Sequence, residues 1–236
     1  MPLTIDPHVL TQTTLDSGSL TVLAALIHSF PEPGQYRGVA TQGTSPGTVF
    51  FISVDPNSPA LQADVDLPAL QNGRSSTQGC SPTAVEPGCH FVVNPRGHVV
   101  FFVSSGAGGF TVKVRNVNAN VTSFDSQQLK PGDLLAATLI RPGTYSVTNA
   151  SGGPPAQVQV AYPTIGNTPF RPPDTVTIQC TPNGFSPASI ALQPGQGQIY
   201  QFAIPSRIKI ELIKPDDGPG GTPTPAAPKR KKVPAT

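Results

Sequence analysis

The chain has 236 residues, enough for one large or two small domains with a hydrophobic core, and only 12% of its residues are charged. This low charge content disfavours helices covered with Glu and Lys pairs, whereas 23 Gly and 29 Pro residues indicate frequent turns. Four of the 15 basic residues lie at positions 229–232, which leaves 11 basic against 13 acidic residues elsewhere, so the rest of the chain is not a basic nucleic-acid-binding domain. No stretch of about 20 apolar residues occurs, which excludes a membrane-spanning helix.

The first part of the chain is expected to form a small β domain over residues 1–78. Residues 19–29 are the longest apolar run, and the turn residues on both sides favour a strand over a helix. Three more strands follow at 35–40, 48–54 and 61–67, and apolar and polar residues alternate along the last of them. The pattern indicates roughly four antiparallel strands.

Residues 71–90 are rich in Asn, Gly, Ser and Pro and are expected to form a surface loop at the domain boundary. The loop contains Cys80 and Cys89, whose spacing suits a disulfide that closes it in an oxidising compartment. The alternative is that both are free thiols. Cys180 falls on the apolar side of an alternating strand and is expected to be a buried free thiol.

A second β domain is expected over residues 79–213. Between 110 and 115, three apolar residues point one way and Thr111, Lys113 and Arg115 the other. The regular strand spacing, with Pro-Gly turns between strands, favours an antiparallel β-sandwich, so the predicted fold class is all-β with two small sandwich domains. The expected strands are 91–93, 97–103, 110–115, 134–140, 143–148, 156–162, 175–180, 198–204 and 207–212.

Two segments of the second domain resemble the cupredoxin family. Residues 184–202 (GFSPASIALQPGQGQIYQF) resemble its opening strands, and residues 141–148 (RPGTYSVT) resemble the strand before its metal loop. The resemblance implies a cupredoxin-like sandwich, with an Ig-like sandwich as the alternative. A blue-copper site needs two His, a Cys and usually a Met, and the loop after Asn149 has none of them, so no copper site or other cofactor is expected.

The last segment, residues 214–236, has almost nothing to bury and is expected to be a disordered, Pro-rich tail. It carries Lys229, Arg230, Lys231 and Lys232, a basic cluster typical of nuclear import signals or of polyanion binding. The alternative is that the cluster only aids solubility.

Candidates for chemistry are few. His90 and His98 lie near Cys80 and Cys89, but adjacent residues of a strand point to opposite faces, and the spacing is not that of metal ligands. The sequence has no Gly-x-Ser-x-Gly motif for a nucleophile. No catalytic, cofactor or metal residue is therefore assigned.

The sequence predicts a non-enzymatic binding or structural assembly protein that has a protein partner or assembles with itself. Its basic tail would tether it to nucleic acid or an anionic surface. One alternative is a metal-dependent or hydrolytic enzyme that uses His90 and His98, and another is a secreted cell-surface module marked by the Cys80–Cys89 bridge. With no signal peptide visible, the expected location is cytoplasmic, nuclear in a eukaryote, or extracellular if the chain is a mature form.

Overall fold

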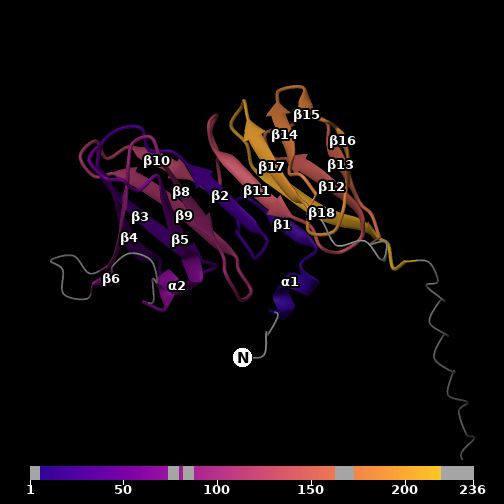
Figure 1. Cartoon of the computed structure of the whole chain (residues 1–236), viewed down its shortest axis with the longest axis horizontal. Helices are drawn as coiled ribbons and strands as arrows, with labels where there is room; N and C mark the ends of the chain where they lie inside the picture. Colours follow the sequence, from indigo (N-terminus) through magenta and orange to yellow (C-terminus); the bar gives the residue numbers. More distant parts are fainter. Residues whose placement is uncertain (1–5, 74–79, 82–87, 163–172, 219–236) are drawn as a thin grey trace, which may run out of the picture.

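The computed structural model describes residues 6–73, 80–81, 88–162 and 173–218, and Figure 1 shows the course of the chain. Nearly all of its regular structure is strand. The elements are α1 (Pro7–Thr11), β1 (Thr14–Asp16), β2 (Ala24–His28), β3 (Gly34–Gln42), β4 (Thr48–Val54), β5 (Gln62–Asp66), α2 (Leu67–Gln71), β6 (Cys80–Ser81), β7 (Gly88–Val93), β8 (His98–Phe102), β9 (Phe110–Asn116), β10 (Thr122–Asp125), β11 (Leu134–Thr138), β12 (Gly143–Asn149), β13 (Ala156–Val160), β14 (Val176–Thr181), β15 (Gly184–Ser186), β16 (Ser189–Leu192), β17 (Gly197–Phe202) and β18 (Ile208–Pro215).

Within the described residues the strands form three sheets. A seven-stranded sheet has the order β15-β14-β17-β11-β2-β8-β5, a six-stranded sheet the order β10-β9-β3-β4-β7-β6, and a five-stranded sheet the order β1-β18-β12-β13-β16. The ring centroids of Phe50 on β4 and Phe101 on β8 lie 6.1 Å apart, so the six-stranded sheet packs against the β8 end of the seven-stranded sheet. The five-stranded sheet packs over the other end (Figure 1).

The expected antiparallel β-sandwich is wrong, because all three sheets are mixed and the chain winds between them as a β-solenoid of about three turns. Strands β4, β5, β7 and β8 alternate between two layers, so β7 lies parallel beside β4, and β8 parallel beside β5. The second half winds in the same way, since β16 lies parallel beside β13 and β17 parallel beside β14. Strand spacing and turn residues predict where strands lie, but not which strands pair. A chain that changes layer after each strand returns to the same layer one turn of the solenoid later, and there it runs in the same direction, so the two strands pair in parallel.

The ladders cross the domain boundary expected at residue 79. Strands β2, β3 and β4, before it, pair with β8, β9 and β7, after it. At the other end β18 continues to Pro215, into the segment expected to be disordered from residue 214. In residues 184–202, where the opening strands of a cupredoxin-like sandwich are expected, β16 and β17 belong to different sheets and each makes a parallel pair.

The second half of the chain repeats the topology of the first. Strand β3 pairs antiparallel with β4 and β9, as β12 does with β13 and β18. The parallel pairs β4–β7 and β5–β8 recur as β13–β16 and β14–β17. Strands β2 to β9 therefore correspond to β11 to β18.

Individual hydrogen bonds repeat as well. The hydroxyl of Tyr36 donates to the carbonyl of Glu32 at 2.8 Å, and the hydroxyl of Tyr145 donates to the carbonyl of Arg141 at 2.8 Å. Both tyrosines follow a Pro-Gly-x sequence at the start of equivalent strands. Shared side-chain contacts at matching register positions indicate that the two halves are copies of one supersecondary unit.

The two halves exchange one strand each. Strand β10 lies just before the second half in the sequence but pairs with β9 of the first half. Strand β1 lies just before the first half but pairs with β18 of the second half. The residue after each exchanged strand is a buried serine that fixes the crossing: Ser126 Oγ accepts from Val112 N at 2.9 Å, and Ser17 Oγ accepts from Ile208 N at 3.0 Å. The exchange ties the halves together by backbone hydrogen bonds.

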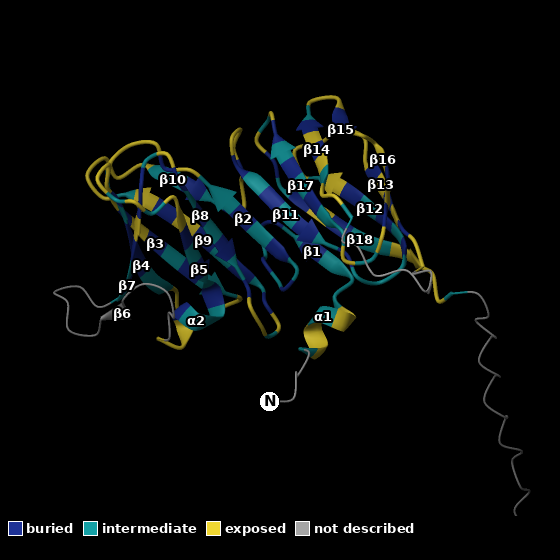
Figure 2. Cartoon of the chain, viewed as in Figure 1, coloured by how far each residue is buried: buried dark blue, intermediate teal, exposed yellow. Residues whose placement is uncertain are grey.

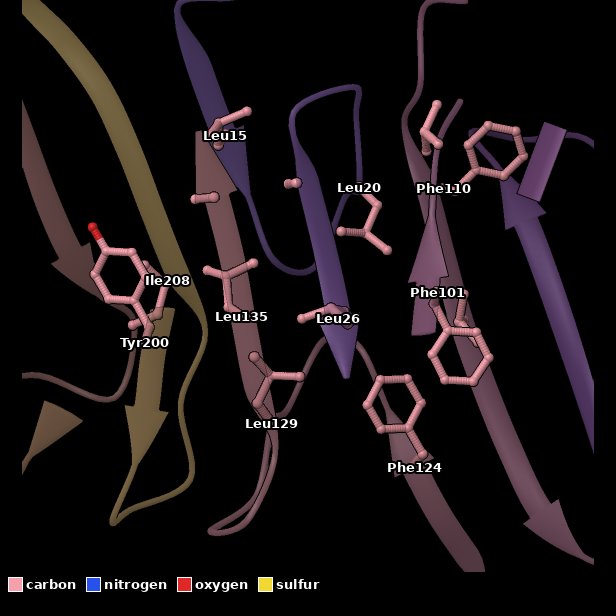
Figure 3. Packing of buried hydrophobic residues seen from close by; sticks show 14 of the residues in the cluster. Leu15, Leu20, Leu26, Phe101, Phe110, Phe124, Leu129, Leu135, Tyr200 and Ile208 are labelled. Atoms are coloured by element: carbon pink, nitrogen blue, oxygen red, sulfur yellow. The ribbon is translucent and has the colours of Figure 1, made fainter. Parts of the chain in front are cut away.

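One hydrophobic core runs through both halves (Figure 2). Strands β2 and β11 pair antiparallel where the halves meet, and Leu26 lies opposite Leu135. Figure 3 shows these leucines with Phe101 and Phe124 on one side and Tyr200 and Ile208 on the other. The rings of Phe101 and Phe124 stack with centroids 5.0 Å apart, which joins the exchanged strand β10 to the seven-stranded sheet.

Candidate functional site

A groove of about 540 Å³ lies on the outer face of β10, β9 and β3 in the six-stranded sheet. Its volume is within the roughly 300–1,000 Å³ range of sites that bind small molecules. We call it the β9 groove, and its charged lining residues are Arg37, Lys113, Arg115 and Asp125.

Strand alternation places these side chains on one face. On β9, Val112 and Val114 are buried in the core, so Lys113 and Arg115 point to the outer face, as the alternation between 110 and 115 predicted. On β3, the same alternation puts Arg37 on the outer face because its neighbours are buried. Two cations from β9 and one from β3 thus meet in the groove.

Arg37 and Arg115 lie directly opposite each other in the β3–β9 ladder. Neither side chain has an ion pair or a hydrogen bond with another described residue, whereas Lys113 Nζ lies 3.2 Å from Asp125 Oδ2. Like charges that face each other across two strands are destabilising, on a scale where cross-strand pairs contribute roughly 0.2–1 kcal/mol. The sheet therefore carries an uncompensated pair of guanidinium groups.

The second half shows that the fold does not need this pair. At the equivalent register position of the β12–β18 ladder, Ser146 lies opposite Glu211. Glu211 Oε1 pairs with Lys209 Nζ at 2.7 Å, and Asp16 Oδ2 pairs with Arg207 at 2.9 Å. The equivalent register position thus holds a paired carboxylate in the second half, whereas in the first half it holds an Arg37–Arg115 couple without an ion pair to any described residue.

The rim of the groove is a turn between β9 and β10. Asn116 Oδ1 accepts hydrogen bonds from the backbone N–H groups of Asn118 and Ala119, both at 3.0 Å, which fix the turn. Val117, with 51% of its surface exposed, and Asn120 line the groove from this turn. The groove thus offers amides and an apolar contact beside its cations.

Next to Arg37, on β4, lies Phe51, whose ring stacks on His90 of β7 with centroids 4.8 Å apart. His90 Nε2 is buried and has no hydrogen-bond partner among the residues that the structure describes. His98 is on β8 of the seven-stranded sheet, and both histidines point away from the buried residues of their own strands. They therefore lie on the outer faces of different sheets and do not form one site.

The three cysteines are distributed as follows. Cys180 is a free thiol and is buried, as expected. Cys89 is disulfide-bonded, and Cys80 lies opposite it in the short β6–β7 ladder. The side chain of Cys80 lies outside the described residues, so the Cys80–Cys89 pairing stays a prediction.

The basic cluster Lys229, Arg230, Lys231 and Lys232 also lies outside the described residues. Among the residues that are described, no three His, Cys, Asp or Glu side chains gather closely enough to hold a metal ion. None of the helices in these ranges has the length and apolar character needed to cross a membrane.

Sequence reasoning missed the β9 groove, although a signal for it exists. Residues 111–115 (TVKVR) and 207–211 (RIKIE) occupy equivalent places, and they differ in the sign of the last charge. Aligning the two halves would have marked Arg115 as a departure from its counterpart. Comparison of the chain with family models, curated proteins and solved structures gave no match.

Proposed function

We propose that this chain is a non-enzymatic binding protein that holds an anionic ligand in the β9 groove. The observation that carries the proposal is the Arg37–Arg115 couple, which has no ion pair with a described residue and which the topologically equivalent second half replaces with Ser146 and Glu211. A guanidinium group presents a planar fork of N–H donors that matches phosphate, sulfate and carboxylate oxygens. An anion between the two forks would remove their repulsion and use their free donors.

The test follows backbone amide signals of the full chain by NMR during titration with inorganic tripolyphosphate. We expect saturable shifts in β3 and β9, which weaken as ionic strength rises because salt screens exposed charges. The variant R37S/R115E gives the groove the residues of the second half, whose ladder shows that a sheet of this kind accepts them. In this variant the shifts in β3 and β9 should disappear.

The matched control is R96S/K214E, which changes the net charge by the same amount at two exposed cations outside the groove. It should keep the shifts in β3 and β9. If tripolyphosphate leaves these strands unperturbed in the native chain, or if the control loses the response as fully as R37S/R115E, the groove is not the anion site.

The tether role of the basic cluster at 229–232 is a separate proposal, supported by its sequence alone. Replacing its four basic residues by Gln belongs to the same series of titrations, with heparin as an added polyanion. The tether proposal requires weaker heparin binding with unchanged groove shifts. Unchanged heparin binding would reject the tether and leave the groove proposal intact.

A further inference from the structure

We infer that the ligand of the β9 groove is a small sugar phosphate, with its phosphate between Arg37 and Arg115 and its hydroxyl groups at the Asp125 end. The inference rests on the proposed anion-binding function and specifies its ligand class. Three features of the groove support it: the uneven distribution of its charge, its neutral lining and its size.

Charge is distributed unevenly along the groove. At one end Arg37 and Arg115 face each other, and no carboxylate of a described residue pairs with either of them. At the other end the charge of Lys113 is neutralised by Asp125, whose Oδ2 lies 3.2 Å from Lys113 Nζ. Lys113 and Arg115 are two residues apart on one strand, so these ends are separated by roughly 7 Å. An anion that is charged along its whole length would bring a negative group against Asp125, and a ligand with one charged end would not.

Asp125 is held where it can accept hydrogen bonds from a ligand. Its Oδ1 accepts from the backbone N–H of Gln127 at 3.0 Å, and its Oδ2 pairs with Lys113. Each carboxylate oxygen has further lone pairs for hydroxyl donors. A carboxylate that binds sugar hydroxyls beside a phosphate-binding element is a recurrent arrangement in nucleotide sites.

The neutral lining suits the rest of a sugar. Thr41, Thr111 and Asn120 bring hydroxyl and amide groups into the groove, while Val39 and Val117 bring apolar surface for ring carbons. The volume of about 540 Å³ fits one small ligand. A sugar phosphate uses all three kinds of lining, whereas inorganic phosphate would use the arginines alone.

The experiment measures dissociation constants of the full chain for ribose 5-phosphate, inorganic phosphate and a ten-residue single-stranded oligonucleotide, with NMR shifts to locate each. Ribose 5-phosphate should bind about tenfold more tightly than inorganic phosphate, because its hydroxyl groups make additional hydrogen bonds in the groove. R37S/R115E should lose both small ligands.

Asp125→Asn tests the hydroxyl end. It should bring the affinity for ribose 5-phosphate close to that for inorganic phosphate, without weakening phosphate itself, because a negative charge has been removed from the groove. The control is Asp16→Asn at the equivalent position of the second half, where Asp16 accepts from Gly18 N at 2.8 Å and pairs with Arg207. Asp16→Asn should leave the ratio of the two affinities unchanged.

The results distinguish binding of a sugar phosphate from binding of anions in general. If tripolyphosphate perturbs the groove but ribose 5-phosphate binds no better than inorganic phosphate, the groove binds anions and the sugar phosphate assignment is wrong. If the oligonucleotide binds the groove more tightly than ribose 5-phosphate, the ligand is a nucleic acid strand, and the assignment is again wrong. If none of these anions perturbs β3 and β9, the inference and the proposed function both fail.

Discussion

Buried tyrosines show how single residues couple the stability of this chain to pH. Tyr200 is fully buried, its hydroxyl donates to Gln198 Oε1 at 2.9 Å, and burial raises its pKa above the ordinary value of 10.0. Burial also raises the pKa values of Tyr36 and Tyr145. In each case the folded state favours the protonated phenol more strongly than the unfolded state does.

The unfolding free energy should therefore fall at alkaline pH. The contribution of these tyrosines is fully present below pH 10, and it is lost as pH rises above 10, because the unfolded chain then ionises first. Each such tyrosine adds a slope of up to about 1.4 kcal/mol per pH unit. Urea denaturation at a series of pH values between about 9 and 11 gives the unfolding free energy as a function of pH. Its decrease with pH should be shallower for Tyr200→Phe than for the native chain.

The comparison variant is Tyr162→Phe, since 46% of the Tyr162 surface is exposed. Tyr200→Phe also removes the hydrogen bond to Gln198, so it should be less stable at neutral pH while its alkaline slope is shallower. Equal slopes for the two variants would contradict the assignment of the alkaline loss to the buried phenol.

At the scale of elements, equivalent ladders solve one packing problem in two ways. In the β3–β4 ladder Gly38 lies opposite Phe50, and in the β12–β13 ladder Val147 lies opposite Ala156. A Cβ added to Gly38 would lie 2.1 Å from Phe50 Cζ, so the glycine is what admits the aromatic ring. The larger side chain of the pair is on β4 in the first half and on β12 in the second. In both halves the pair consists of one larger and one smaller residue.

Gly38→Val should therefore destabilise the chain by at least about 1–3 kcal/mol through overpacking against Phe50. Phe50→Ala alone should cost about 3–5 kcal/mol, because it leaves a cavity beside Phe91 and Phe101. The double variant recreates the pair found in the second half, and its loss should be smaller than the sum of the single losses by about 0.5–3 kcal/mol. Chemical denaturation of the four proteins measures this coupling, and additive losses would mean that the two ladders are not equivalent in packing.

At the scale of the whole molecule, the two halves share one core, and we expect them to unfold as one unit. A single core cluster extends through both, each half contributes an edge strand to the other, and β2 pairs with β11 where they meet. Leu26 and Leu135 lie opposite each other in that ladder, and both are fully buried. A change at either leucine is therefore a change in both halves.

Leu26→Ala and Leu135→Ala should each lower the unfolding free energy by about 2–5 kcal/mol. Calorimetry should show one transition for the native chain and for both variants, because unfolding one half exposes the edge strand and core of the other. Amide hydrogen exchange should accelerate in β9 as well as in β18 for either variant. Two separate transitions, or faster exchange confined to the half that carries the substitution, would contradict a shared core.

The amino-acid sequence by itself determined where many strands lie. The alternation at 110–115 predicted both the strand and the outward direction of Lys113 and Arg115, because the face on which a strand residue lies depends only on its position along the strand. The run at 61–67 was predicted only in part. Ala63 and Val65 are buried in β5 as expected, and so is Leu67, but Leu61 is 54% exposed and Leu67 begins α2. Local patterns define the ends of elements least well.

The tertiary structure alone decided which strands pair. The parallel neighbours β4–β7 and β5–β8 arise because the chain alternates between two layers, and the exchange of β1 and β10 depends on contacts between residues far apart in the sequence. The β9 groove has the same origin. Arg37 and Arg115 are each ordinary outward residues of a strand, and they become a candidate site only because β3 and β9 are neighbours in register.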